Sequence, residues 1–291
     1  MFFQPKVSPL PPGIDLSGKT AVITGASAGI GLETARQLLQ LNCTTVILAV
    51  RNVSKGEACA RELRQDPIIK ANNPTIKVLY LDMELDNSIQ DFTKTLQREV
   101  PQVDILILNA GISTFKMERT PNNHEKCLQI NYLSNVLLLA TLLPYLNASA
   151  ERTGSPTRVT WVGSRMHERM HSFEKSPPLA TSSSIFAHMD SEAHFRFDLR
   201  YGDTKLLCAM FMYELVSRLD GNKILLNMVC PGQIHTGMSD YLPFYVRVPV
   251  NLIKALRARP VEVGGWCIVH AAAVAGPETH GRHLGDKEVL E

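Results

Sequence analysis

Tyr201 and Lys205 are four positions apart in the segment Tyr201-Gly202-Asp203-Thr204-Lys205, which begins a run of helical apolar periodicity. In a helix this spacing puts both side chains on one face. A phenol titrates near pH ~10, so it is a poor acid–base catalyst at neutral pH. A neighbouring ammonium favours the phenolate and lowers the pKa of the phenol. The pair therefore predicts a proton-transferring tyrosine tuned by a lysine. The alternative is that the two residues are simply neighbours on the exposed surface of a helix.

Two further polar residues are expected near that helix. Ser164 ends the apolar segment Trp161-Val162-Gly163-Ser164, so its hydroxyl can reach a crevice at the strand end. Asn131 lies in a predicted helix that precedes this strand. Together with Tyr201 and Lys205, they supply a hydroxyl that polarises a carbonyl, a phenol that delivers a proton and an ammonium that tunes it.

A glycine-rich turn near the N-terminus predicts a phosphate-binding site. Gly25, Gly29 and Gly31 follow the short apolar strand Thr20–Thr24 and lead into a helical pattern. A strand, a glycine turn and a helix start aim unpaired N–H groups and a positive helix end at a phosphate. Side chains at the glycines would obstruct a pyrophosphate. A strand-to-helix connection without a ligand is the alternative.

Residues at three other strand ends extend this prediction. Arg51 lies where an acidic residue would bind the free ribose hydroxyl of NAD, and a guanidinium there suits a 2′-phosphate instead. The sequence therefore favours NADP over NAD. Asp82 ends the third strand, where its carboxylate could accept a hydrogen bond from the adenine amino group. The fourth strand ends in a second sharp turn, Asn109-Ala110-Gly111.

The order of elements predicts the fold class. Apolar strands alternate with helical segments, which is typical of a doubly wound parallel α/β sheet of the Rossmann type. Residues 1–17 are rich in proline and are expected to form an extended arm, with one domain at 18–291. Two segments without clear periodicity, 165–200 and 232–260, follow strands at the ligand-binding edge and are expected to form substrate loops, the second around a short helix. The strands are expected at Thr20–Thr24, Thr45–Ala49, Lys77–Leu81, Ile105–Leu108, Arg158–Val162 and Lys223–Val229, and the helices at Gly29–Leu41, Val53–Gln65, Ser88–Val100, Glu125–Leu146 and Tyr201–Leu219.

Composition limits the function classes. The 291 residues are 45% hydrophobic with a net charge of +2, which fits one large core and gives no support for nucleic-acid binding. The six cysteines have no paired spacing and are expected to be reduced, as in a cytoplasmic protein. The N-terminus does not read as a secretory signal, and the longest apolar run, Val136–Leu143, is too short to span a bilayer.

Over residues 17–285, the chain resembles the short-chain dehydrogenase/reductase family. The segment Thr24–Gly31 resembles its cofactor loop, and Asn109-Ala110-Gly111 resembles its sheet-stabilising turn. The resemblance implies that Tyr201 is the general acid/base, that Lys205 lowers its pKa and binds the nicotinamide ribose, that Ser164 orients the substrate oxygen, and that Asn131 holds a water in a proton relay. The cofactor-binding residues are expected to be Gly25, Ser27, Ala28, Gly29, Ile30, Gly31, Arg51, Asn52, Asp82, Met83, Asn109, Ala110, Gly111, Tyr201, Lys205, Pro231, Gly232, Ile234 and Thr236.

The spacing of the catalytic residues indicates the substrate branch. Thirty-seven positions separate Ser164 from Tyr201, more than in compact members of the family. This length resembles the branch of retinol-dehydrogenase-like enzymes and biosynthetic ketoreductases. We therefore expect an NADP(H)-dependent oxidoreductase of secondary metabolism that acts on a small, apolar ketone or secondary alcohol. The expected pocket residues are Met166, Phe195, Phe197, Met238, Tyr241 and Phe244.

Several alternatives stay open. The same fold could catalyse an epimerisation or a cyclisation, or it could bind NADP as a sensor. His167-Glu168-Arg169-Met170-His171 matches the H-E-x-x-H pattern of zinc hydrolases, which functions only on a helix. Pro177 and Pro178 follow closely and leave little room for one, so no metal is expected. Family resemblance suggests a homodimer or homotetramer, and a monomer is also compatible.

Overall fold

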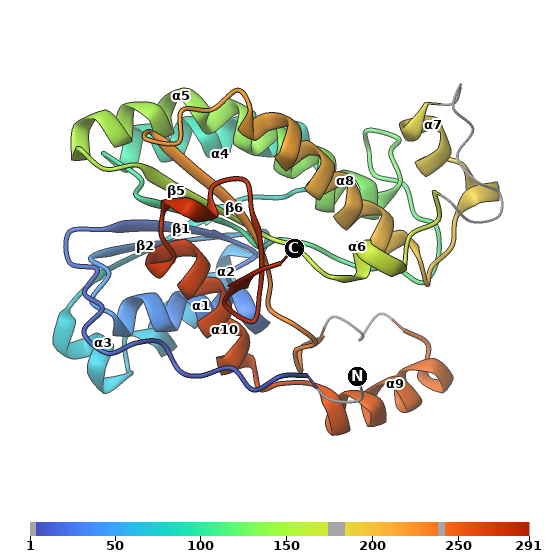
Figure 1. Cartoon of the computed structure of the whole chain (residues 1–291), viewed down its shortest axis with the longest axis horizontal. Helices are drawn as coiled ribbons and strands as arrows, with labels where there is room; N and C mark the ends of the chain where they lie inside the picture. The colour runs from blue at the N-terminus through green and yellow to red at the C-terminus, as the bar shows by residue number, and fades with distance from the viewer. Residues whose placement is uncertain (1–3, 174–183, 238–241, 291) are drawn as a thin grey trace.

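The computed structural model describes residues 4–173, 184–237 and 242–290 (Figure 1). Within these residues one sheet has the order β3-β2-β1-β4-β5-β6-β7-β8, in which β1 to β7 run parallel and β8 pairs antiparallel with β7. The predicted doubly wound parallel fold is confirmed. The strands are β1 (Thr20–Thr24), β2 (Thr45–Val50), β3 (Thr75–Tyr80), β4 (Ile105–Leu108), β5 (Thr157–Val162), β6 (Ile224–Cys230), β7 (His283–Gly285) and β8 (Glu288–Val289).

Helices cover both faces of the sheet (Figure 1). The face drawn below the sheet carries α1 (Gly29–Gln40), α2 (Val53–Leu63), α3 (Pro67–Asn72) and α10 (Val261–Val269), and the other face carries α4 (Asp86–Glu99), α5 (Ser134–Thr153) and α8 (Arg200–Val216). Strand order reverses between β1 and β4, because the chain first builds outward through β2 and β3 and then returns. In such sheets the crevice at this switch point binds the ligand.

The core lies in two layers because β1 is buried on both faces. Ala21 and Ile23 pack in the layer on the side of α1 and α10, whereas Val22 packs in the layer on the side of α4, α5 and α8. Successive side chains of a strand point to opposite faces, so a strand covered on both sides is apolar at every position. This explains why the strands read as continuous apolar runs, and why the bounds of β1 and β4 agree with the sequence-based expectation.

One long helical stretch differs from the expected Glu125–Leu146 helix. It begins as a π-helix, Leu128–Leu133, and continues as α5 to Thr153. Glu125 lies before it, and its carboxylate accepts hydrogen bonds from the N–H groups of Cys127 and Leu128. By length and composition alone Leu128–Thr153 could cross a membrane, and 44% of its most apolar window is buried inside the structure. Its buried side packs in the core layer it shares with α4 and α8.

Both segments expected as loops contain helices. The 165–200 segment contains α6 (Met166–Arg169), α7 (Ile185–Met189) and a 3-10 turn, Glu192–His194. The 232–260 segment contains α9 (Phe244–Arg257), which is longer than expected because Pro249 interrupts its apolar pattern without ending it. After α10 come a π-helical turn (His270–Val274), a 3-10 turn (Pro277–Thr279) and β7 and β8, which are too short to produce periodicity.

Residues 4–17 contain no helix or strand and lie along the C-terminal part of the chain (Figure 1). Gln4 exchanges hydrogen bonds with the backbone of Gln233, and Arg259 donates to the carbonyl of Pro5. Lys287 donates to the carbonyls of Ser8 and Pro9. These contacts attach the arm to the segments around α9 and β7.

We predict that Gly265→Ala destabilises the protein. A Cβ at Gly265 would lie 2.4 Å from Gln37 Nε2, and that amide already donates to Glu33 and to the carbonyl of Glu262. Overpacking costs about 1–3 kcal/mol, and the helix propensity of alanine returns about 1 kcal/mol. Urea denaturation should therefore show a net loss of up to about 2 kcal/mol in unfolding free energy. In a Gln37→Ala background the same substitution should cost nothing, and an equal cost there would contradict this account.

Candidate active site

The glycine turn at the end of β1 forms an anion-binding helix start. Gly25 and Gly29 have φ values of 67° and 53°, which non-glycine residues rarely adopt. The N-cap of α1, Ala28, provides no side-chain hydrogen bond, and no acidic residue lies in the first turn. The first N–H groups of α1 therefore remain available to an anionic ligand, which the helix dipole also favours.

Asn109 fixes this turn to the end of β4. Its Nδ2 donates to the carbonyl of Thr24 at 2.8 Å, while the N–H groups of Asn109 and Ala110 both donate to Thr24 Oγ1 at 2.9 Å. A Cβ at Gly31 would lie 2.5 Å from the Asn109 amide. Asn109 therefore supports the turn, and Gly31 is required by this close approach of α1 to β4.

A cleft of about 740 Å³ opens at this switch point. Of the predicted cofactor-binding residues, it is lined by Gly25, Ser27, Ala28, Gly29, Ile30, Gly31, Arg51, Asn52, Asp82, Met83, Asn109, Ala110, Gly111 and Thr236. The lining also includes residues that were not predicted: Ala49, Lys55, Leu81, Ile112, Ser113, Ile130 and Gly237.

Five predicted cofactor contacts do not line this cleft: Tyr201, Lys205, Pro231, Gly232 and Ile234. Pro231, Gly232 and Ile234 follow β6 and lie beyond its wall. A Cβ on Gly232 would meet the side chains of Gln4 and Arg259, so this residue faces the N-terminal arm and Arg259. Their contact with a cofactor stays a prediction.

Two cations lie at one end of the cleft, where Arg51 follows β2 and Lys55 lies in α2. The Arg51 side chain is 65% exposed and forms an ion pair of 2.7 Å with Glu84. Lys55 was missed, although its spacing of four from Arg51 was a usable signal. Asp82 accepts a hydrogen bond from the N–H of Glu84, so part of its carboxylate holds the turn after β3.

The predicted catalytic residues come together beside this cleft. Tyr201 and Lys205 lie on the first turns of α8, and Lys205 Nζ is 5.5 Å from the centroid of the Tyr201 ring. Ser164 follows β5, and its hydroxyl is hydrogen-bonded to Tyr201. A Cβ on Gly111 would lie 3.3 Å from Asn131 Oδ1 and 3.7 Å from Lys205 Nζ, which places these two residues next to a glycine that lines the cleft.

The electrostatics of the pair differ from the expectation. Burial raises the pKa of Tyr201, and burial lowers the pKa of Lys205. The hydrogen bond from Ser164 acts in the opposite direction and lowers the Tyr201 pKa. Lys205 Nζ donates to the carbonyl of Val162 at 2.7 Å. The prediction that the ammonium sets a low Tyr201 pKa is therefore wrong for this structure, since desolvation outweighs the neighbouring charge.

Asn131 lies in the π-helix, and both polar atoms of its side chain form hydrogen bonds. Oδ1 accepts from the N–H of Ile112 at 2.7 Å, and Nδ2 donates to the carbonyl of Ile112 and to Thr204 Oγ1. The water-holding role implied for Asn131 is not tested by these contacts and stays a prediction. The side chain ties the segment after β4 to α8, next to Lys205.

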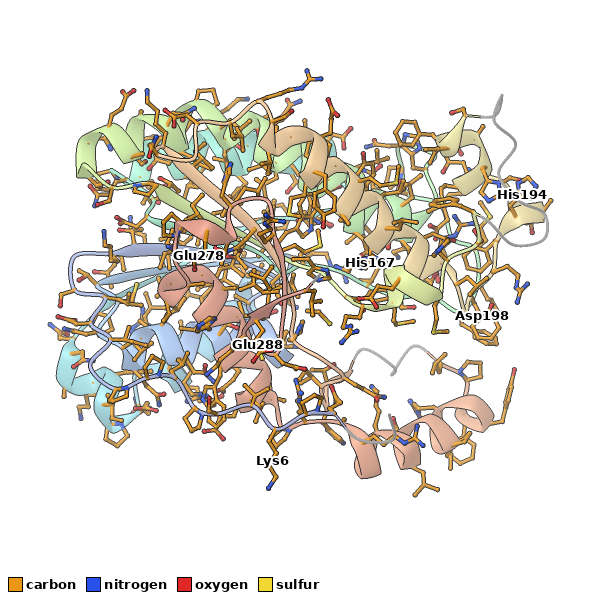
Figure 2. The ribbon with its side chains drawn as sticks, in the orientation of Figure 1. Lys6, His167, His194, Asp198, Glu278 and Glu288 are labelled. Atoms are coloured by element: carbon orange, nitrogen blue, oxygen red, sulfur yellow. The ribbon has the colours of Figure 1, made fainter. Side chains whose placement is uncertain are left out.

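The H-E-x-x-H pattern does not form a helical metal pair. Helix α6 ends at Arg169, before His171, so the two imidazoles do not share one helix. His167 is hydrogen-bonded to the carbonyl of Ser164 and packs against His283, with 5.0 Å between ring centroids and the rings tilted by 38°. Figure 2 shows His167 near the sheet and His194 at the outer end of the 165–200 segment. Among the described residues, no three His, Cys, Asp or Glu side chains gather around a metal site.

The expected pocket residues have different environments. Phe197 is 41% exposed and contacts Phe115, with ring centroids 4.7 Å apart. Phe195 packs on the guanidinium of Arg200 at 5.4 Å. Phe244 lies on α9 and is 73% exposed. Met238 and Tyr241 lie outside the described residues, and the pocket remains a prediction.

The family model for short chain dehydrogenases matches residues 19–169. The chain is 58% identical over 292 positions to the short chain dehydrogenase yanD of Aspergillus niger, covering 100% of this chain and 88% of that protein. It is 58% identical over 290 positions to the short chain dehydrogenase macD of Penicillium terrestre, with 99% and 88% coverage. The RhlG/NADP complex of Pseudomonas aeruginosa has a similar fold, with a TM-score of 0.67, 23% identity and coverage of 95% and 97%.

This chain therefore belongs to the short-chain dehydrogenase family. Members of the family are oxidoreductases that act on small molecules with a nicotinamide cofactor. The cleft fits such a group, because its helix start offers N–H groups and no acidic side chain to a pyrophosphate, and two cations lie at the far end.

We predict that His283 makes the protein sensitive to acid. His283 is 6% exposed, and burial lowers its pKa to about 4. The unfolded chain binds a proton below pH ~6.5, so stability should fall as the pH drops from about 6.5 to about 4. Between pH 7 and pH 5, the parent should lose about 2 kcal/mol more unfolding free energy than His283→Met, measured by urea denaturation. Between pH 7 and pH 8 the difference should stay constant; a parallel loss in both proteins at pH 5 would contradict the assignment.

Proposed function

We propose that this protein is an NADP(H)-dependent oxidoreductase that transfers a hydride from the nicotinamide to the carbonyl carbon of a ketone. In the reverse direction it would take the hydride from the carbon that bears the hydroxyl of a secondary alcohol. One observation carries the proposal: Ser164, Tyr201 and Lys205 lie together beside the cleft whose glycine turn forms an anion-binding helix start. When bound, the cofactor supplies the hydride chemistry.

The residues of the chain would orient the substrate and transfer the proton. Ser164, which is hydrogen-bonded to Tyr201 in the protein without substrate, would turn its hydroxyl to the carbonyl oxygen of a bound substrate. Tyr201 would protonate that oxygen as the carbon is reduced. Lys205, attached to the carbonyl of Val162, would hold positive charge beside the phenol. Asn131 would keep the turn after β4 against α8, through its bonds to Ile112 and Thr204. General acid–base catalysis of this kind contributes about 10²–10⁴ in rate.

We further propose that the substrate is an apolar ketone or alcohol of the kind found in secondary metabolism. The half-exposed pair of Phe115 and Phe197 supports this proposal, since it joins the segment after β4 to the 165–200 segment. Aromatic side chains offer large contact areas to apolar ligands. A cytoplasmic location and a homodimer or homotetramer stay predictions.

We predict that Tyr201→Phe abolishes turnover. The change removes the proton donor but keeps the ring, so kcat should fall by a factor of about 10² or more while NADPH binding stays intact. NADPH oxidation would be followed with cyclohexanone, acetophenone and α-tetralone. Tyr213→Phe, an exposed tyrosine of the same helix, is the control and should retain parental activity. Parental turnover by Tyr201→Phe would exclude this mechanism, and a product of unchanged mass would indicate non-redox catalysis.

We predict that Arg51→Ala weakens NADPH binding by about tenfold and changes NADH binding by less than about twofold. The expected loss of NADPH affinity is modest because Arg51 is largely exposed and must give up its ion pair with Glu84 to bind the 2′-phosphate. Dissociation constants would be measured from quenching of intrinsic fluorescence. Lys55→Ala, at the same end of the cleft, should weaken NADPH binding in the same direction. Equal losses for the two cofactors would refute the 2′-phosphate assignment.

A further inference from the structure

The segment 165–172 lies directly against the first turn of α8. Helix α6 occupies its first half, and the carbonyl of Met170 lies so close to Gly202 that a Cβ there would be 1.6 Å from it. Because this is a backbone contact, no rotation of a side chain can relieve it. Residue 202 must therefore be glycine for the segment to remain in place.

Both ends of this segment are attached to α8, on either side of Gly202. At one end, Ser164 is hydrogen-bonded to Tyr201, and its hydroxyl also accepts from the N–H of Met166 at 3.2 Å. At the other end, the carboxylate of Asp203 accepts from both the N–H and the hydroxyl of Ser172, the latter at 3.0 Å. Asp203 is 0% exposed and Ser172 6% exposed, so water does not compete for these bonds.

Asp203 and Tyr201 are two positions apart, so they lie on nearly opposite sides of α8. Tyr201 contacts Ser164 in the candidate site, whereas the carboxylate of Asp203 binds Ser172 of the segment. We propose that Asp203 is a positioning residue that, through Ser172 and the contact of Met170 with Gly202, holds Ser164 at hydrogen-bonding distance from Tyr201. This inference deepens the proposed function and rests on it.

Among the groups around Tyr201, Ser164 is the one whose contact lowers the pKa of the phenol. Tyr201 faces Lys205 and Cys208 of α8, Cys230 of β6, and Cys127 before the π-helix. Burial raises the pKa of all three thiols, so they are neutral at the working pH. The Ser164 bond is thus the contact that lowers the Tyr201 pKa, and loosening it should raise that pKa.

The charged or titratable groups that face Asp203 are Arg200 of α8, His171 of the segment and His188 of α7. Arg200 and His171 favour the ionised form of Asp203 against burial. Arg200 is 1% exposed and also contacts the 165–200 segment at the carbonyl of His194 and faces Glu125 at 3.9 Å. The hydrogen bonds and the charge of Asp203 therefore need separate variants. Asp203→Ala removes both, whereas Asp203→Asn can keep both contacts with Ser172 and removes only the charge.

The test is the pH dependence of alcohol oxidation, in which Tyr201 must accept a proton. The substrates would be cyclohexanol, 1-phenylethanol and α-tetralol with NADP. In Asp203→Ala and Gly202→Ala the rising limb of kcat/KM should move to higher pH by about half a unit, a threefold loss at neutral pH that disappears at high pH. Asp203→Asn should keep the parental profile. Asp91→Ala, which removes an exposed carboxylate of α4, is the matched control.

A uniform loss at every pH, or an unshifted profile in Asp203→Ala and Gly202→Ala, would overturn the inference. A defect in Asp203→Asn equal to that in Asp203→Ala would assign the effect to charge and overturn the hydrogen-bond account. If the parent oxidises none of the alcohols and reduces none of the ketones, the proposed function fails. Hydrogen exchange then tests the attachment separately, since the 166–172 amides must exchange faster in Asp203→Ala than in the parent or in Asp203→Asn, and unchanged exchange overturns it.

Discussion

The site depends on the link between the ends of β1 and β4. Thr24 and Asn109 bond through side chains and backbone, so the glycine turn and the turn after β4 are held as one unit. These contacts lie where the order of the parallel strands reverses, so the cleft opens at that point. Because Gly31 packs on the Asn109 amide, the start of α1 is fixed in the same unit. Cofactor position therefore follows from sheet topology and one asparagine.

Helix α8 connects that cleft to the rest of the catalytic apparatus. Its inner face carries Tyr201 and Lys205, while Arg200 and Asp203 bind the 165–200 segment. The long spacing between Ser164 and Tyr201 is thus occupied in part by structure that returns to α8, at Ser172 and again before Arg200. A longer segment does not loosen the site, since its buried ends are attached to the helix that holds the phenol.

Pattern in the sequence was sufficient for the fold and for most of the residues that line the cleft, because apolar strands and glycine turns are local signals. It was insufficient where the outcome depends on packing. The amide of Asn131 binds the backbone of Ile112, and no local pattern encodes this contact. The role of Asp203 could not be predicted, although it lies between Tyr201 and Lys205, because its partner Ser172 lies 31 positions away. Helices α6 and α7 are too short for periodicity to reveal them.

Desolvation of Tyr201 and Lys205 also depends on packing, and it could not be predicted from local sequence pattern. Burial raises the pKa of Tyr201 and lowers that of Lys205, so both groups are driven toward their neutral forms. A phenolate can form at moderate pH only if hydrogen bonds and charge stabilise it at the moment of proton transfer. Lys205 supplies charge only while it is protonated, whereas the Ser164 hydroxyl donates irrespective of pH. The position of Ser164 is therefore as important to the reaction as the lysine itself.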